Sequence, residues 1–251
     1  MTLTLLHTAD LHGSMTDEIR DRLLVLRERA DFYFDCGDAV KAGNVGVPTS
    51  PDPVWTYFRD LRCTAGVPGN REFHVSSSVF RKKLQGCSHP LLAANLHWNG
   101  RARRPLLPNS EGDFYWPKGN ALPAAKVLGE IGLFGVMVPM VRERMAARFV
   151  SAFLNTDPVE AARDCVEWLR PRCRLVIGLS HIGLREDVRL LEQVKGIDIL
   201  LGGHSHDLLD EPLRVGEGWL MHVGSHAFQA GLHEYRNGTL TTHLEILRSR
   251  R

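Results

Sequence analysis

Short apolar runs alternate along the chain with segments whose apolar residues recur at helical spacing. Strands are predicted for six apolar runs, at residues 3–7, 32–36, 91–95, 131–138, 175–179 and 197–201. Helices are predicted for five segments, one after Thr16, one at residues 54–62, one at residues 79–84, one after Asp157 and one at residues 184–195. Thr16 and Asp157 are suitable N-caps, because a side-chain oxygen at that position accepts a hydrogen bond from a free helix amide. The alternation predicts a layered α/β fold.

The end of the chain has a different pattern. Strands at residues 219–223, 232–235 and 239–247 follow one another closely, and Asn237-Gly238 predicts a tight hairpin turn between the last two. Residues 98–120 have no periodicity and are too long to be an idle connection in a compact domain. Because there is no internal repeat and no change of composition, we expect a single domain over residues 1–251.

The composition limits the class of protein. Apolar residues make up 43% of the 251 and charged residues 24%, which excludes a disordered or fibrous chain. The net charge of +2 does not require a nucleic-acid or membrane partner, and no apolar run approaches the ~20 residues of a membrane span. The N-terminus lacks the basic and long apolar regions of a signal peptide, so we expect a cytoplasmic protein.

Cysteine and histidine indicate what kind of metal site the chain could form. The five cysteines are an odd number and contain no Cys-x-x-Cys pair, which argues against a disulfide framework and against a thiolate zinc cluster. Twelve histidines are unusually many for this length. A metal site is therefore expected to use imidazole, carboxylate and amide ligands.

Candidate ligands follow the predicted strands, at the edge where open α/β sheets bind their ligands. Five motifs occupy these positions: Asp10-Leu11-His12, Gly37-Asp38, Gly69-Asn70-Arg71-Glu72, Ser180-His181 and Gly202-Gly203-His204-Ser205-His206. Each motif alone is weak, since a lone histidine at a strand end is more often a hydrogen-bonded loop residue. Together they supply seven nitrogen or oxygen donors and no sulfur, at Asp10, His12, Asp38, Asn70, His181, His204 and His206. The set predicts a metal centre.

The order of these motifs resembles the calcineurin-like metallophosphoesterase family, in which Asp-x-His, Gly-Asp, Gly-Asn-His, a lone His and Gly-His-x-His follow one another. The nearer resemblance is to the catalytic domain of the 5′-nucleotidases, through residues 5–13, 179–184 and 196–206. It extends from about residue 3 to residue 235 and is weakest between residues 98 and 120. The resemblance implies a four-layer α/β/β/α sandwich with a dinuclear metal site at the C-terminal ends of the strands.

The resemblance also implies a ligand set and a reaction. The first metal would bind Asp10, His12, Asp38 and His206, and the second would bind Asp38, Asn70, His181 and His204, with Asp38 bridging. Two cations ~3.5–4 Å apart can clamp a phosphoryl group and activate water. We therefore expect hydrolysis of phosphate mono- or diesters by attack of metal-bound hydroxide, on a phosphorylated small molecule or nucleotide, with nucleic acid not excluded. Manganese is the metal expected from the family, and the mixed ligands also suit zinc or iron.

One family motif is changed in this chain. Where the family has Gly-Asn-His with an Asp three residues further on, this chain has Arg71 and His74. Arginine stays protonated, so Arg71 can neutralise charge on a phosphate but cannot act as a general acid. In one interpretation Arg71 binds the phosphate and His74 transfers a proton. In the second, Arg71 pairs with a carboxylate such as Glu72 and His74 is a loop residue. In a third, the site binds metal with altered or lost catalysis, and the protein acts through binding or assembly.

The second departure from the family is length. The 5′-nucleotidases continue into a C-terminal domain that holds the nucleoside, whereas this chain ends soon after its last predicted strands, so we expect that domain to be absent. Residues 98–120 offer a substitute in which aromatic rings stack on a base and arginines lie near phosphates. The residues concerned are Phe114, Tyr115, Trp116, Arg101, Arg103 and Arg104. The alternative, which we favour, is that the aromatic rings bury a long loop against the core.

Two further residues are assigned from the resemblance. Asn95 matches a recurrent family asparagine near the phosphate and is a candidate substrate ligand. His226, in Gly224-Ser225-His226, belongs to a segment that returns toward the site, and we interpret it as structural.

Overall fold

Two β-sheets run through the centre of the computed structural model, which describes residues 1–100, 106–107 and 112–248. The first sheet has the order β14-β13-β1-β2-β3 and consists of β1 (Thr2–Thr8), β2 (Phe32–Asp35), β3 (Ala65–Gly66), β13 (Gln229–Arg236) and β14 (Thr239–Ile246). The second has the order β11-β12-β10-β9-β7-β6-β5 and consists of β5 (Asp113–Tyr115), β6 (Ala125–Leu128), β7 (Ile131–Met137), β9 (Leu175–His181), β10 (Ile199–Gly202), β11 (Leu213–Val215) and β12 (Gly218–His222). A separate antiparallel pair joins β4 (Leu96–Trp98) to β8 (Phe153–Asn155).

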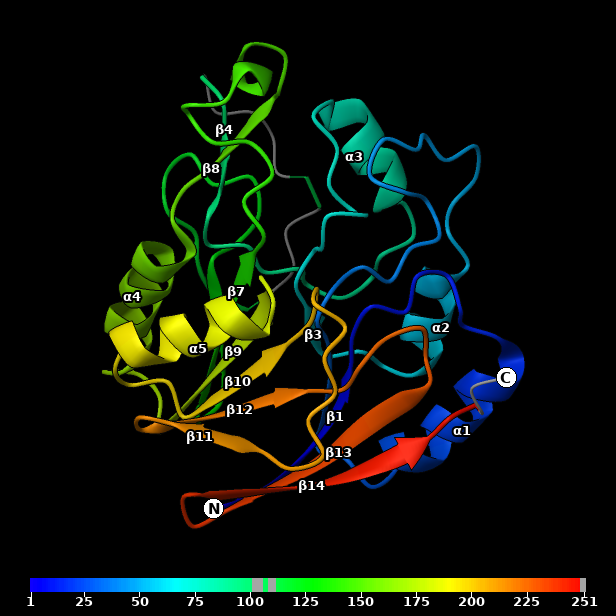
Figure 1. Ribbon diagram of the computed structural model, residues 1–251, viewed down its shortest axis with the longest axis vertical. Coiled ribbons are helices and arrows are strands. Elements are labelled where there is room, and N and C mark those ends of the chain that lie inside the picture. The colour runs from blue at the N-terminus through cyan, green and yellow to red at the C-terminus, as the bar shows by residue number, and fades with distance from the viewer. Residues whose placement is uncertain (101–105, 108–111, 249–251) are drawn as a thin grey trace.

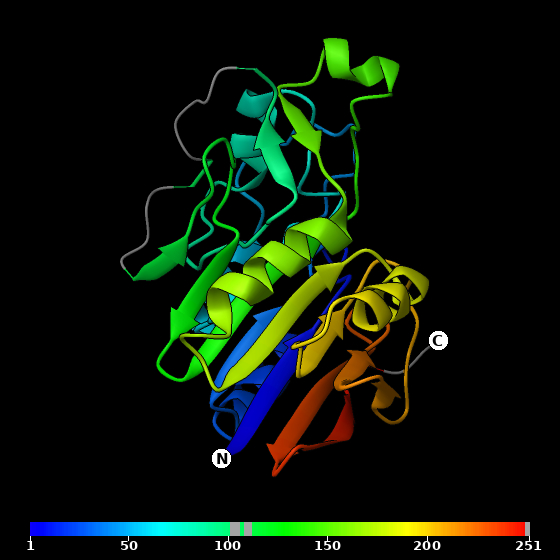
Figure 2. The ribbon, with the colours of Figure 1, turned by 90° about the vertical axis from the view of Figure 1, so that its left-hand side faces the viewer.

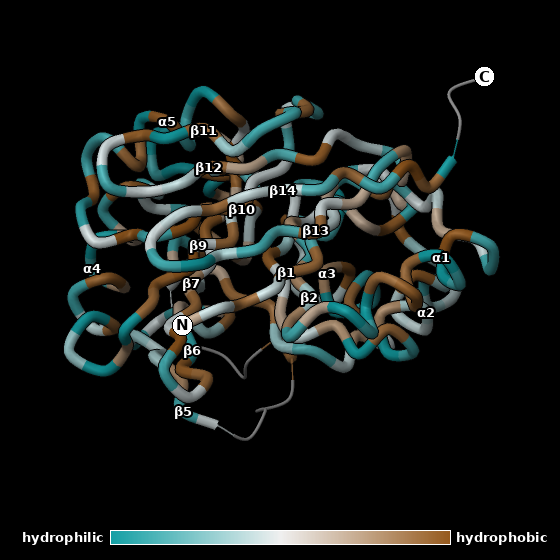
Figure 3. The backbone as a smooth tube through the Cα atoms, turned by 90° about the horizontal axis from the view of Figure 1, so that it is seen from below, coloured by the Kyte–Doolittle hydropathy of each residue, from teal (hydrophilic) through white to brown (hydrophobic). Residues whose placement is uncertain are grey.

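The two sheets lie face to face, and helices cover their outer faces (Figures 1, 2 and 3). Helices α1 (Asp17–Arg27) and α2 (Val54–Asp60) lie against the first sheet, and α4 (Pro158–Leu169) and α5 (Leu184–Gln193) lie against the second. Helix α3 (Ser77–Lys83) and the short 3-10 helix η1 (Ala146–Phe149) lie beyond the upper ends of the sheets in Figure 1. The four-layer α/β/β/α sandwich implied by the sequence is therefore confirmed.

Side-chain hydrogen bonds explain why two helices begin directly after the predicted N-caps. Thr16 Oγ1 accepts a hydrogen bond from Ile19 N (3.3 Å) at the start of α1. Asp157 Oδ1 accepts bonds from Val159 N (2.8 Å) and Glu160 N (3.3 Å) at the start of α4. Each side-chain oxygen satisfies amides that have no partner within the helix, and each helix then buries one apolar face.

The core has two parts, one that lies between the sheets and continues under helices α1 and α2, and one between the second sheet and helices α4 and α5. Strands β7 and β9 are buried along their whole length because both faces of the central, parallel part of the second sheet are covered. The hairpin between β13 and β14 turns at Asn237 and Gly238, which both have positive φ, as predicted. All five cysteines are free. Within the described part of the chain, no helix is both long and apolar enough to span a bilayer.

The prediction of a strand at residues 91–95 is wrong. Leu91 forms only an isolated bridge, and the strand lies just after it, at β4. The amide of Leu92 donates to Gly66 O and that of Ala94 donates to Gly135 O, so consecutive residues bond to different neighbours and no ladder forms. Strand β5 lies within residues 98–120, which have no periodicity in the sequence, and it pairs with β6, for which no strand is predicted.

Candidate metal centre

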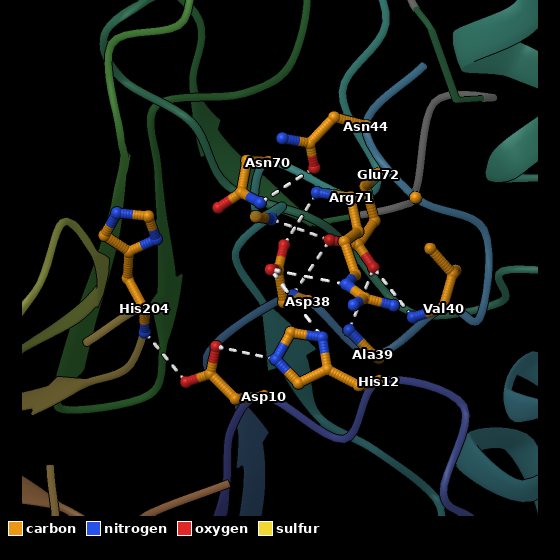
Figure 4. Close-up of polar contacts among 12 residues, drawn as sticks. Asp10, His12, Asp38, Ala39, Val40, Asn44, Asn70, Arg71, Glu72 and His204 are labelled. Carbon is orange, nitrogen blue, oxygen red and sulfur yellow. Dashed lines mark hydrogen bonds and ion pairs between the residues drawn. The ribbon is translucent and has the colours of Figure 1, made fainter. Parts of the chain in front are cut away.

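The seven predicted ligands meet at one edge of the sandwich. Strands β1, β2 and β3 are parallel in the first sheet, and β7, β9, β10 and β12 are parallel in the second. The loops after β1, β2, β3, β9 and β10 therefore leave the sheets at their carboxyl ends, and their side chains converge there (Figure 4).

The loop backbone is bent where the ligands lie. Five of the seven residues have a left-handed conformation, with φ of 52° at Asp10, 50° at His12, 53° at Asp38, 82° at His204 and 61° at His206. Such conformations are uncommon for residues other than glycine and concentrate at functional sites. Each loop thus turns sharply at the end of its strand and presents its side chain to the same space.

Two buried carboxylates form the centre of the cluster. Asp10 Oδ2 accepts a hydrogen bond from His204 N (2.8 Å), while Oδ1 has no hydrogen-bond partner and lies 3.6 Å from His12 Nε2 and 3.5 Å from His206 Nε2. Asp38 Oδ1 lies 3.5 Å from His181 Nε2, and its Oδ2 lies 3.9 Å from His12 Nδ1. Asp38 therefore faces histidines of both sheets.

Asp10 lies between two imidazoles, and that of His12 is in the neutral form that can bind a cation. Burial, followed by the nearby Arg71 guanidinium, lowers the pKa of His12 to about 3, so its ring is neutral at neutral pH. The Asp10 carboxylate, 3.5 Å from Nε2, raises the pKa of His206. The Nε2 atoms of His12 and His206 are 2.8 Å apart. Two ring nitrogens so close together must share a proton or a common cation, because two lone pairs would repel.

Hydrogen bonds fix the orientation of the groups on the other side of Asp38. His181 Nδ1 donates to Cys36 O (2.6 Å), which leaves the lone pair on Nε2. Asn70 Nδ2 donates to Asn44 Oδ1 (2.9 Å), which turns Asn70 Oδ1 toward His181 Nε2, 3.3 Å away. Three acceptors, from His181, Asn70 and Asp38, consequently face one another. A bound cation stabilises this arrangement, whereas without a cation the lone pairs repel one another.

Gly69 allows this close approach. A Cβ atom at position 69 would lie 2.1 Å from Asp38 Oδ1 and 2.7 Å from His181 Nε2. Only glycine can hold the Asn70 loop so near the cluster. The close approach of the loop and the facing acceptors fit a metal centre made from carboxylate, imidazole and amide groups. Such a set of ligands suits divalent transition metals.

Glu72 connects two of the ligand loops. Its buried carboxylate accepts four main-chain hydrogen bonds, with Oε1 bonding to Ala39 N (2.9 Å) and Val40 N (3.0 Å) and Oε2 bonding to Asp38 N (2.9 Å) and Gly69 N (2.8 Å). Glu72 is thus occupied by main-chain amides and does not pair with Arg71. That element of the second sequence interpretation is wrong.

Lys83 binds main-chain carbonyls of the same region. Its ammonium is buried and lies within hydrogen-bond distance of four carbonyl oxygens, of Gly43 (2.9 Å), Asn44 (3.2 Å), Arg71 (2.6 Å) and Phe73 (3.1 Å), among which its three N–H groups are shared. Burial lowers the pKa of Lys83 to about 8, partly offset by Glu72 and Asp38. Glu72 and Lys83 are missed by the sequence interpretation, because a charged residue bound to main-chain groups leaves no signature in the spacing of side chains.

Arg71 faces the cluster and His74 does not contact it. Arg71 N donates to Asp38 Oδ1 (2.7 Å), and Arg71 Nε lies 4.0 Å from Asp38 Oδ2. Its Nη1 donates to Lys41 O (3.2 Å). His74 Nδ1 accepts a hydrogen bond from Ser76 N (2.9 Å), and burial lowers its pKa. The structure thus brings one of the two predicted catalytic residues to the candidate ligands.

The proposed substrate residue Asn95 is fully buried and bonded to one strand. Its Nδ2 donates to Met137 O (2.8 Å) and its Oδ1 accepts from Met137 N (3.0 Å). Both ends of the amide are therefore engaged at the end of β7, and a role in substrate binding stays a prediction.

The aromatic residues after position 98 pack against the protein, as we favoured. Tyr115 stacks on Trp168 of α4, with ring centres 5.1 Å apart, and Trp116 Nε1 donates to Asn120 O (3.1 Å). Phe114 lies under the Lys126 ammonium, 4.7 Å away. The predicted phosphate contacts Arg101, Arg103 and Arg104 lie outside the described residues.

A buried network behind the cluster has no counterpart in the sequence interpretation. Ser180 Oγ donates to Asp187 Oδ1, and His222 Nε2 lies 2.8 Å from Asp187 Oδ2. Ser180 precedes the ligand His181 on β9, so the network ties that strand to α5 and β12. His226 is also closer to the ligands than expected, with its ring beside those of His12 and His206.

Comparisons with known proteins agree with this geometry. A family model described as calcineurin-like phosphoesterase matches residues 3–208. The chain is 25% identical over 240 residues to the trifunctional nucleotide phosphoesterase protein YfkN of Bacillus subtilis, covering 83% of this chain and 16% of that protein. It is 25% identical over 236 residues to the snake venom 5′-nucleotidase of Naja atra, covering 82% of this chain and 41% of that protein. The chain thus spans less than half of either relative.

A solved structure has the same fold. The crystal structure of the 5′-nucleotidase precursor from Thermus thermophilus superposes with a TM-score of 0.74 at 19% identity, covering 98% of this chain and 54% of that chain. At this identity the similarity concerns the architecture, which both proteins share almost throughout the present chain.

Proposed function

Because the chain belongs to the calcineurin-like phosphoesterase family, we propose that it hydrolyses phosphate mono- or diesters with the help of two divalent metal ions. The observation that carries the proposal is the set of facing acceptors around Asp38, whose two oxygens lie 3.5 Å from His181 Nε2 and 3.9 Å from His12 Nδ1. In this proposal the first metal is held by Asp10, His12, Asp38 and His206, and the second by Asp38, Asn70, His181 and His204.

The metals and the chain have separate tasks. Two divalent cations bound there supply Lewis-acid charge to the phosphoryl oxygens and make water a stronger nucleophile near neutral pH. Arg71 binds the phosphate and neutralises its charge, since its guanidinium lies beside Asp38 and partly open to solvent. Proton transfer by His74 stays a prediction, and because its Nδ1 accepts from Ser76 N, only Nε2 is left for that task.

The substrate class follows from the relatives and is part of the proposal. The names of the relatives refer to nucleotides, so we propose a nucleotide or another phosphorylated small molecule as substrate. We also propose manganese as the metal, with zinc or iron as alternatives, and a single catalytic domain over residues 1–251 that acts in the cytoplasm. The open Arg71 side of the cluster supports access for a phosphate group.

The proposal is tested with p-nitrophenyl phosphate and bis-p-nitrophenyl phosphate. Protein freed of metal is assayed alone, with Mn²⁺, Zn²⁺ or Mg²⁺, and again after a chelator is added. We expect at least one metal to produce hydrolysis of at least one ester and the chelator to remove it. If no metal raises hydrolysis above the metal-free rate with either ester, the enzymatic proposal fails, and binding or assembly without catalysis becomes the better account.

Replacing Arg71 with His tests whether the missing family histidine limits the rate. A positioned general acid contributes about 100-fold or more, so an imidazole without its family partner is expected to raise p-nitrophenyl phosphate hydrolysis by roughly tenfold at most. Arg71→Lys is the control, because it keeps the charge but loses the planar fork, and its rate should fall. An unchanged rate in Arg71→His would mean that the proton comes from elsewhere.

A further inference from the structure

A fifth imidazole lies at the candidate metal centre. The ring centre of His226 is 4.7 Å from that of His12 and 5.4 Å from that of His206. A nitrogen of each of these three rings lies within 4.8 Å of a nitrogen of the others. The three residues come from three different loops, so helix or strand periodicity does not account for their proximity.

The loop that carries His226 forms main-chain hydrogen bonds with both neighbouring ligand loops. His226 N donates to Asp10 O (2.7 Å), and Gly224 N donates to Asp207 O (2.8 Å) next to His206. His226 and Ala227 both have left-handed backbones, with φ of 56° and 53°. The bent backbone of His226 matches that of the candidate ligands Asp10, His12, Asp38, His204 and His206.

The ring of His226 has one nitrogen available. Its Nδ1 lies 2.9 Å from Ser225 Oγ, a hydrogen bond that holds the ring. Among the residues that the structure describes, Nε2 has no hydrogen-bond partner. A ring that is held through one nitrogen and lies beside two candidate ligand imidazoles has the form of a metal-binding histidine.

We propose that His226 is an additional ligand of the metal at the first position, beside His12 and His206. The inference rests on the proposed metal centre and deepens it. The first position then has three imidazoles with the carboxylates of Asp10 and Asp38, whereas the second has two imidazoles, Asn70 and Asp38. A nitrogen-rich position favours Co²⁺ and Zn²⁺ over Mn²⁺ more strongly, so the two positions differ in metal preference.

The test measures metal binding directly. Metal-free full-length protein and the variant His226→Gly are titrated with Co²⁺, with binding followed by calorimetry and by visible absorption of the cobalt. Glycine suits the left-handed backbone and keeps the amide that bonds to Asp10 O, and His226→Asn is a second variant with the same tolerance. His243→Ala is the matched control, because His243 is exposed on β14 and pairs with Glu245 (3.3 Å).

We expect both His226 variants to weaken Co²⁺ binding at one of two positions by at least about tenfold, since even the loss of an outer partner of a metal ligand costs about 10- to 100-fold. The cobalt absorption of that position should also change, while His243→Ala binds as the original protein does. Unchanged affinity and absorption in both His226 variants would overturn the assignment, even if hydrolysis fell. If the original protein bound no Co²⁺, the metal centre itself would be refuted.

Discussion

Asp38→Asn is expected to lower metal-dependent hydrolysis of both p-nitrophenyl esters by more than about 100-fold, because loss of even an outer partner of a metal ligand costs about 10- to 100-fold. Asp38 is the carboxylate whose two oxygens face His181 and His12. In asparagine one of these oxygens becomes an amide that carries hydrogens toward a ring nitrogen. Such a group can neither bridge two cations nor balance their charge.

The variant should fold, which makes the result interpretable. Asparagine tolerates the left-handed backbone at position 38 (φ 53°) better than most residues, and its oxygen can still accept from Arg71 N. The measurements are kcat/KM with saturating Mn²⁺ and the metal content of the purified protein. Asp21→Asn is the matched control, since Asp21 is exposed and accepts hydrogen bonds from the neighbouring Arg20. Retention of more than a tenth of the activity in Asp38→Asn would contradict a bridging role.

The position of the candidate ligands could be predicted because it depends on strand ends. Asp10 and Asp38 directly follow strands β1 and β2, and His181 ends β9. Within each sheet the carboxyl ends of parallel strands meet at one edge, so a prediction of strands is enough to bring the side chains of that sheet together. The meeting of the two edges depends on how the sheets pack, which the resemblance to the family implied. Even the misplaced strand at residues 91–95 did not affect this prediction, since none of the seven candidate ligands lies on it.

The groups that hold the ligands could not be predicted in the same way. Glu72 and Lys83 bond to main-chain amides and carbonyls of loops, and the direction of those groups depends on backbone angles that side-chain periodicity does not reveal. His226 reaches the cluster only because its loop bends at a non-glycine residue and lies beside Asp10. From the sequence alone it is interpreted as a structural residue in a segment that returns toward the site.

The contacts of the neighbouring Glu72 decide whether it is the partner of Arg71. The sequence left open whether Arg71 faces the metals or pairs with Glu72. Because all the acceptor positions used by Glu72 serve main-chain amides, Arg71 is left to lie beside Asp38. Arg71 therefore pairs with a carboxylate other than Glu72, and its guanidinium lies beside a candidate metal ligand. Its contact with a phosphate stays a prediction.

Glu72→Gln is expected to lower the free energy of unfolding by about 3 kcal/mol or more, because charged hydrogen bonds contribute about 1.5–3 kcal/mol each and buried amides left unpaired cost about 1–3 kcal/mol each. Each Glu72 oxygen accepts from two main-chain amides, so the amide nitrogen of glutamine would face two donors with no acceptor to offer. In a domain of this size the loss corresponds to a fall of roughly 6–12 °C in Tm.

The same change should also weaken metal binding, because Glu72 joins the loop of Asp38 to the loop that begins at Gly69. Thermal unfolding is measured with and without Mn²⁺, and the stabilisation by the metal should be smaller in the variant than in the original protein. Glu130→Gln is the control. Glu130 is exposed and its carboxylate lies 3.5 Å from Arg174, and a surface ion pair of this kind contributes about 0–1 kcal/mol to the free energy of unfolding. Equal Tm values for Glu72→Gln and Glu130→Gln would show that the four main-chain bonds do not hold the ligand loops together.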